Sequence, residues 1–267
     1  MSVVAKRHEL PAGRRLRSGH TLYWWAEVLA ILAFYFVYSA IRNWNSSGDM
    51  EAFENAKLVM QWERWLGIFH EETLQDWALE LKPIIIAANY FYGSLHFVAT
   101  IGAGIFLYRR FTDDYPRYRN MLAVTTALAL IGFRFFPLMP PRLLETVSVH
   151  DYGFVDTLAR YPTPWSFNSG AVSKISNQFA AMPSVHVAWA TWVALVFAPR
   201  TRHVALRALA IAYPVVTVIV IVLTGNHYIL DAVGGLVVLA VGWYASGRFT
   251  KAGRIADEEP DRVSASS

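Results

Sequence analysis

The stretch YPVVTVIVIVLTG, residues 213–225, has no polar face, because apolar side chains surround the helix that it would form. VLAILAFYFVYSA, residues 28–40, has the same character. A helix that is apolar all round belongs in a membrane or in the core of a large protein. Of the 267 residues, 55% are apolar and 16% are charged. These values favour a membrane protein over a soluble α-helical protein with unusually apolar helices.

Working outward from these stretches yields six candidate membrane spans, each close to the roughly 17–25 residues that cross the hydrocarbon. They are Leu22–Ile41, Pro83–Tyr108, Met121–Leu138, Pro183–Ala198, Val204–Leu223 and Tyr228–Ala245. We predict an all-α membrane protein in which residues 22–246 form a six-transmembrane-helix bundle. A basic cytoplasmic N-terminus (1–21) precedes it, and a disordered cytoplasmic tail (247–267) follows. A cleaved signal peptide is not expected, since no small-residue cleavage site follows the first apolar run.

The basic residues orient this topology. With the N-terminus in the cytoplasm, the inner segments hold sixteen Lys and Arg and the outer segments hold seven, as the positive-inside rule requires. The same orientation brings Pro137–Arg142, Pro183–His186 and Gly225–Asp231 to the outer face. We therefore expect a multi-pass integral membrane protein, placed in the plasma membrane, with its active site on the extracytoplasmic face.

Residues 49–81, between the first two spans, follow a different pattern. Apolar side chains recur at near-helical spacing, with charged side chains mostly between them. The apolar positions are Phe53, Ala56, Val59, Leu66 and Phe69. We predict an amphipathic helix at the outer membrane interface; a helix packed on the bundle is the alternative. The pattern assigns no role to Glu63 or Glu71.

Composition limits the chemistry. The chain has no cysteine, so disulfides and thiolate metal sites are impossible. The net charge of +4 is too mild and too scattered to indicate a nucleic-acid partner.

The stretch HYILD, residues 227–231, places His227 and Asp231 four residues apart on one helical face. An aspartate bonded to one imidazole nitrogen fixes the tautomer and raises the basicity of the other nitrogen. A histidine nucleophile or general base needs this arrangement. A buried His–Asp pair with no catalytic task is the alternative.

The stretch MPSVH, residues 182–186, adds a helix start. Pro183 suits the first turn, because it lacks an N–H that would have no partner there. The amides of Ser184 and its successors then face the membrane surface and favour phosphate. His186 is a candidate proton donor to a leaving oxygen. A plain helix start, from which His186 reaches water, is the alternative.

The stretch RFFPLMPPR, residues 134–142, supplies two arginines. Arg134 lies in the last turn of the third span, and an arginine inside a span is costly and usually paired or functional. Arg142 follows the prolines. Two guanidinium groups can clamp phosphate oxygens bidentately. Anchoring to lipid head groups is the alternative, and it is stronger for Arg142, because Arg134 is expected to lie deeper.

Together these parts predict a phosphoryl-transfer site with a nucleophile, an orienting carboxylate, a proton donor and phosphate ligands. In that order they are His227, Asp231 and His186, then Arg134, Arg142 and Ser184. Two histidines and an aspartate also suit iron or zinc. The nearby arginines would repel a cation, so we expect neither a metal nor a cofactor.

The combined motifs resemble the type 2 phosphatidic acid phosphatase superfamily, which shares its site with vanadium haloperoxidases. They look most like its branch that contains inositol phosphorylceramide synthase. The Pro-Ser-Gly-His motif stands here as Pro183–His186, with valine in the third position, as is typical of that branch. The His-x-x-x-Asp motif is matched by His227 and Asp231, with Gly234-Gly235 following. Residues 134–142 fit the remaining, arginine-containing motif loosely; the resemblance spans roughly residues 83–245.

This resemblance implies a metal-independent mechanism. His227 attacks phosphorus and forms a phosphohistidine, Asp231 orients it, and His186 protonates the leaving group. Water or an alcohol completes the reaction. Other members carry an arginine six residues before the nucleophile, where this chain has Ile221. That departure favours the synthase-like branch over a simple phosphatase.

Further polar positions are candidates for substrate binding. They are His96 and Tyr92 in the second span, Asn226 beside the nucleophile, and Asp156 and Lys174 in the long outer loop. His96 is equally well explained as a hydrogen-bonding residue between helices.

The leading function is transfer of a phosphate-linked lipid head group (inositol-phosphate-like) through a phosphohistidine, with a polyol such as inositol as the possible acceptor. Hydrolysis of a lipid or polyprenyl (pyro)phosphate is the alternative within the same chemistry. A lipid scramblase or transporter would use the same polar groove but does not need two histidines and an aspartate. A metal-dependent membrane oxidase is the third class, and chelators would abolish its activity.

Overall fold

The computed structural model describes residues 13–44, 48–163 and 179–264. It is about 75% helical with almost no sheet. Its strands, β1 (Arg14–Arg15) and β2 (Thr21–Leu22), form an antiparallel pair. The chain is therefore all-α, as predicted.

Every candidate span lies on a helix. The helices are α1 (Trp24–Trp44), the continuous run of α4 (Lys82–Tyr90), η1 (Phe91–Leu95) and α5 (His96–Arg110), then α6 (Tyr115–Phe135), α9 (Val185–Phe197), α10 (Val204–Leu223) and α11 (Ile229–Ser264). In the described part, three segments are long and apolar enough to cross a membrane: Lys82–Arg110, Val204–Leu223 and Ile229–Arg248. They indicate a membrane-embedded protein, whereas six crossings stay a prediction.

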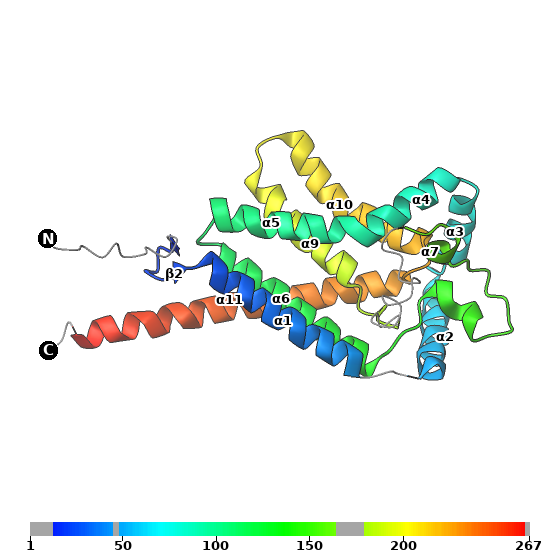
Figure 1. Cartoon of the computed structure of the whole chain (residues 1–267), viewed down its shortest axis with the longest axis horizontal. Coiled ribbons are helices and arrows are strands. Elements are labelled where there is room, and N and C mark those ends of the chain that lie inside the picture. The colour runs from blue at the N-terminus through cyan, green and yellow to red at the C-terminus, as the bar shows by residue number, and fades with distance from the viewer. Residues whose placement is uncertain (1–12, 45–47, 164–178, 265–267) are drawn as a thin grey trace, which may run out of the picture.

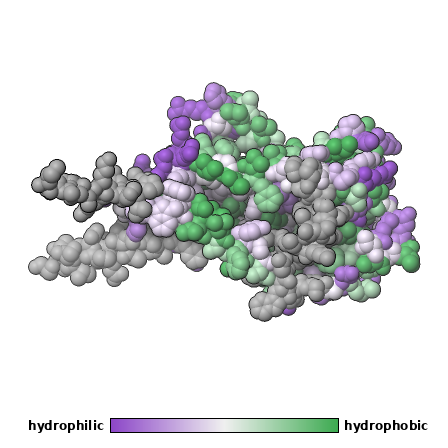
Figure 2. Space-filling view, viewed as in Figure 1, coloured by the Kyte–Doolittle hydropathy of each residue, from purple (hydrophilic) through white to green (hydrophobic). Residues whose placement is uncertain are grey.

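α1, α5, α6 and α11 run roughly along the long axis of the molecule, and α10 runs obliquely to it (Figure 1). α11 packs along α6, and α9 contacts α5, α10 and α11. Gly242 permits the close approach of α6, because a Cβ there would lie 2.3 Å from Thr125 Oγ1. Hydrophobic residues gather over the middle of the surface, with hydrophilic residues toward both ends (Figure 2). This distribution matches a bundle surrounded by lipid at its middle.

The predicted interfacial helix is two helices, α2 (Asp49–Leu66) and α3 (Glu71–Leu79). Gly67 ends α2 with a φ of 70°, a left-handed conformation that favours glycine. The apolar side of α2 packs against Leu138, Met139 and Tyr228. This side of α2 is therefore packed on the bundle, which is the alternative to an interfacial helix. Trp65 remains 84% exposed on the other side.

Short helices complete the end of the molecule at which α2 and α3 lie (Figure 1). They are η2 (Pro141–Thr146) and α7 (Thr157–Arg160), while η3 (Ala198–Arg200) joins α9 to α10. α11 continues to Ser264, whereas the sequence predicts disorder after residue 246.

Candidate active site

The N-terminal ends of α9 and α11 meet at the end of the bundle that carries α2, α3 and α7 (Figure 1). Ser184 donates its backbone N–H to the Asp231 carbonyl at 2.9 Å. A Cβ at Gly235 would lie 2.4 Å from the Ser184 carbonyl oxygen, so only glycine permits this approach. The contact brings the His186 and His227 rings to a centroid distance of 5.6 Å.

His227 and Asp231 form a buried pair. The Nδ1 atom of His227 lies 3.1 Å from Asp231 Oδ2, and Tyr228 donates its backbone N–H to the same oxygen at 3.0 Å. Asp231 is 0% exposed and His227 is 3% exposed. If Nδ1 carries the hydrogen for this carboxylate, Nε2 keeps its lone pair. The structure thus joins the two residues that the HYILD motif predicts to interact.

His186 lies among aromatic rings. Tyr92 stacks on it at a centroid distance of 4.4 Å, and His96 meets it edge-on at 4.3 Å. His96 Nδ1 also lies 3.0 Å from the Tyr92 carbonyl oxygen. The π-helical turn η1 carries Tyr92 and ends directly before His96; such turns often occur at functional sites. Both second-span candidates therefore contact the candidate acid.

Ser184 caps α9. Its Oγ accepts the Val187 N–H at 3.4 Å, and its own N–H is bonded to Asp231, as described above. Ser184 is completely buried. Its hydroxyl and amide therefore stabilise the helix start and the α9–α11 contact. The amides of Val185 and His186, in the first turn of α9, are the ones suited to an anion.

Arg142 lies beside the turn that precedes α11 and contains His227. Its Nε donates to Asn226 Oδ1 at 2.9 Å, and its Nη1 lies 3.1 Å from Asp156 Oδ2. Asn226 in turn donates from Nδ2 to Thr224 Oγ1 at 2.8 Å. Gly225 has a φ of 65° and accepts the Arg142 N–H through its carbonyl at 2.9 Å. Asn226 and Asp156, expected to bind substrate, thus hold an arginine next to His227.

Arg134 is not gathered into this cluster. It is exposed at the end of α6, and its guanidinium lies 5.7 Å from the Phe135 ring. Within the described part of the chain, no hydrogen bond or ion pair joins its side chain to the other candidates. The prediction that Arg134 lies deeper in the membrane than Arg142 stays a prediction. Within the protein, α6 ends at Phe135 and leaves Arg134 exposed, whereas η2 buries Arg142. Lys174 lies outside the described residues.

Several buried polar residues near the site belong to none of the motifs found in the sequence. Gln75 makes two hydrogen bonds to the Val155 backbone, and Asn89 bonds to Thr157. They tie the loop that holds Asp156 to α3 and α4. Glu63 and Glu71 are also completely buried. A sequence signal exists for Glu63, because it follows Ala56 and Met60 on the apolar stripe of α2.

The arrangement suits an anion. The Arg142 guanidinium and the first amides of α9 supply positive electrostatic potential near a buried His–Asp pair and a second histidine. No group of three or more metal-ligating side chains gathers among the residues that the structure describes. The geometry therefore supports nucleophilic attack on an anionic centre with proton transfer by a second histidine.

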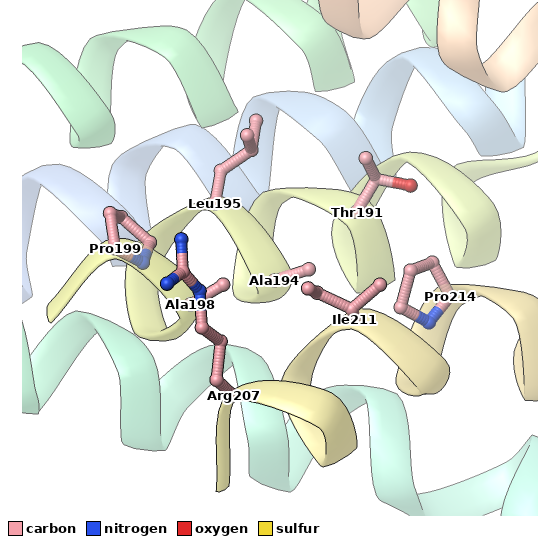
Figure 3. A pocket seen from close by; sticks show the side chains of 8 residues that line it. All are labelled: Thr191, Ala194, Leu195, Ala198, Pro199, Arg207, Ile211 and Pro214. Atoms are coloured by element: carbon pink, nitrogen blue, oxygen red, sulfur yellow. The ribbon is translucent and has the colours of Figure 1, made fainter. Parts of the chain in front are cut away.

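A separate pocket of about 400 Å³ lies between α9 and α10 (Figure 3). Its lining is Thr191, Ala194, Leu195, Ala198, Pro199, Arg207, Ile211 and Pro214. It shares no residue with the cluster around His227, so it is not part of the candidate active site.

Comparison with known proteins identifies one family. The sequence model of the PAP2 superfamily matches residues 57–245, from within α2 to within α11. The match covers more than half of the chain and includes His186, His227 and Asp231. No curated protein and no solved structure matches the chain.

Proposed function

Because the chain belongs to the PAP2 superfamily, whose members are generally phosphatases or phosphotransferases, we propose that it is a membrane lipid phosphotransferase. It moves a phosphate-linked head group through a phosphohistidine, without a metal ion. The observation that carries the proposal is the buried contact of His227 with Asp231, opposite the ring of His186.

In the first step, His227 Nε2 attacks phosphorus and forms an N–P bond. The bond from phosphorus to the leaving oxygen breaks, and protonated His186 gives its proton to that oxygen. Asp231 stabilises the positive charge that develops on the imidazole ring. Arg142 and the first amides of α9 stabilise the charge on the phosphoryl oxygens.

In the second step, an acceptor hydroxyl loses its proton to His186 and attacks phosphorus. The N–P bond breaks and His227 is restored. Water as acceptor yields a free phosphate ester from a diester donor and inorganic phosphate from a monoester donor. An alcohol yields a new phosphodiester from a diester donor and a new monoester from a monoester donor. The site residues are the same in both cases.

We favour an alcohol acceptor, as in the inositol phosphorylceramide synthase branch that the motifs resemble. Ile221 stands where other members have an arginine, and it is buried in an apolar cluster with Val187, Val222 and Ala232. A phosphodiester carries one negative charge and needs fewer cationic ligands than a monoester. Asp156, paired with Arg142, offers a carboxylate near the site to an acceptor hydroxyl. A lipid or polyprenyl phosphate phosphatase is the second candidate.

The nucleophile is tested by trapping. Purified wild-type protein, incubated with ³²P-labelled lipid phosphates and phosphodiesters, should form an acid-labile phosphoprotein. His227→Ala should form none and lose several orders of magnitude in turnover. His203→Ala is the matched control, because His203 is exposed at the start of α10. Near-normal turnover of His227→Ala would refute the mechanism.

The acceptor is tested with the same panel, with and without inositol. Transfer predicts that a polyol raises phospholipid turnover and yields a new phosphodiester. Inorganic phosphate as the sole product, unaffected by any alcohol, would identify a phosphatase. Lipid movement without turnover, retained in His227→Ala, would indicate a scramblase.

A further inference from the structure

Two buried glutamates cap the helix that carries Asp231. Glu63, near the end of α2, accepts the Leu230 N–H through Oε1 at 2.7 Å. Glu71, the first residue of α3, accepts the Ile229 N–H through Oε1 at 2.9 Å. The first N–H groups of a helix have no partner within the helix. Here a segment more than 150 residues away in sequence supplies the acceptors.

The carboxyl groups also interact with each other. Glu71 Oε2 accepts the His70 N–H at 2.9 Å. Glu63 Oε2 is buried and accepts no hydrogen bond from the described residues. A proton on Glu63 makes its carboxyl group a hydrogen-bond donor, and the side chain of Glu71 is a hydrogen-bond partner of that carboxyl group. A protonated Glu63 is favoured beside Glu71, because two buried negative charges repel.

The surroundings reinforce this state. Burial, followed by the hydrogen bond and the negative charge of Glu71, raises the pKa of Glu63 to about 9. Asp231 and Tyr228, near the start of α11, also interact electrostatically with this pair. Both add negative charge when they ionise.

The capped residues adjoin the reacting ones. Ile229 and Leu230 separate Asp231 from Tyr228, whose N–H donates to Asp231 Oδ2. A shift of this turn therefore moves His227 relative to its carboxylate.

We propose that Glu63 and Glu71 are positioning residues: a buried carboxyl pair on α2 and α3 that clamps the first turn of α11 and so orients His227 against Asp231. The pair acts through the backbone and does not touch the substrate. The α2–α3 segment thereby becomes part of the machinery of the site. The inference rests on the proposed function for its kinetic consequences, but not for its structural ones.

The kinetic test compares Glu63→Gln with Glu63→Ala. Glutamine keeps an oxygen for the Leu230 N–H and supplies a permanent donor toward Glu71. It should retain most of the wild-type kcat and lose the alkaline decline that ionisation of Glu63 imposes. Alanine should lower kcat by roughly 100-fold, the effect of a misplaced reacting group, with KM little changed. Glu54→Gln, exposed on the same helix and paired with Lys57, is the control and should match wild type.

The structural test needs no substrate. At neutral pH, hydrogen exchange of a peptide that covers residues 226–236 should quicken in Glu63→Ala but not in Glu63→Gln or Glu54→Gln. Above pH 9, after correction for the base-catalysed rise of intrinsic exchange, it should quicken in wild type and in Glu54→Gln but not in Glu63→Gln. Equal exchange in all variants would overturn the clamp whether or not the lipid reaction is found. Unchanged kcat and pH profile in a folded Glu63→Ala protein would overturn the positioning role. Quickened exchange in a protein inactive on every lipid would uphold the clamp and reject the proposed function.

Discussion

Arg142 is the residue on which the positive charge of the site depends. It uses Nε and Nη1 on two different partners, Asn226 and Asp156, and is only 6% exposed. Lysine presents its donors from a single nitrogen and lacks the planar fork that reaches both partners from separate nitrogens. The guanidinium fork is therefore held in one orientation beside His227.

Arg142→Lys should consequently lower kcat/KM by roughly 10²–10³, as the loss of a charge-stabilising group does. Arg134→Ala is the comparison, since Arg134 is exposed and has no ion pair within the described ranges. Steady-state kinetics on the preferred lipid measure both. A greater loss in Arg134→Ala than in Arg142→Lys would reverse this assignment of the phosphate ligand.

Glu63 should make stability depend on pH. Its pKa rises from 4.5 to about 9 on folding. Between these two pH values the folded protein keeps a proton on Glu63 that the unfolded chain has released. The stabilisation is complete below pH 4.5 and is lost as pH rises toward 9, by at most about 1.4 kcal/mol per pH unit. Thermal unfolding in detergent should show this decline in wild type and a flatter curve in Glu63→Gln. Parallel curves would show that Glu63 ionises alike in both states.

The contacts at the helix ends show which parts of the site can be predicted from the sequence and which cannot. The i, i+4 spacing of His227 and Asp231 is local, so the sequence predicts their contact. The cap by Ser184 is equally local, because proline and serine are typical of helix starts. The contact of Glu63 with Leu230 joins α2 to α11 and has no local signal of its partner. The sequence likewise has no local signal that leaves Arg134 outside the cluster, since its exposure depends on where α6 ends and which helices surround it.

A substitution of Gly235 tests the contact between α9 and α11. A Cβ at this position meets a backbone oxygen of Ser184, and backbone cannot rotate away as a side chain can. Gly235→Ala should separate the helix starts, with a loss of roughly 1–3 kcal/mol in stability and most of the turnover. Gly102→Ala, in α5, is the control, because a Cβ there would meet no atom within 4 Å and alanine favours helix. Thermal unfolding and turnover are measured for both variants. Equal stability and equal turnover of Gly235→Ala and Gly102→Ala would contradict the contact.

At the scale of the whole molecule, the site lies at the end opposite β2 (Figure 1). Apolar surface gathers over the middle of the face seen in Figure 2, so we expect the two ends to face opposite sides of a membrane. Sixteen Lys and Arg fall in the segments expected on the β2 side and seven in those expected on the site side. The positive-inside rule then predicts that the site opens outside the cytoplasm.

Single cysteines test this orientation, because the chain has no native cysteine. Val149 is fully exposed in the loop between η2 and α7, and Arg202 is exposed in the turn between η3 and α10. An impermeant thiol reagent applied to intact cells should label Val149→Cys and leave Arg202→Cys unlabelled. Detergent should make both positions reactive, which controls for buried thiols. Labelling of Arg202→Cys alone in intact cells would place the site in the cytoplasm, where its lipid would have to be drawn from the inner leaflet.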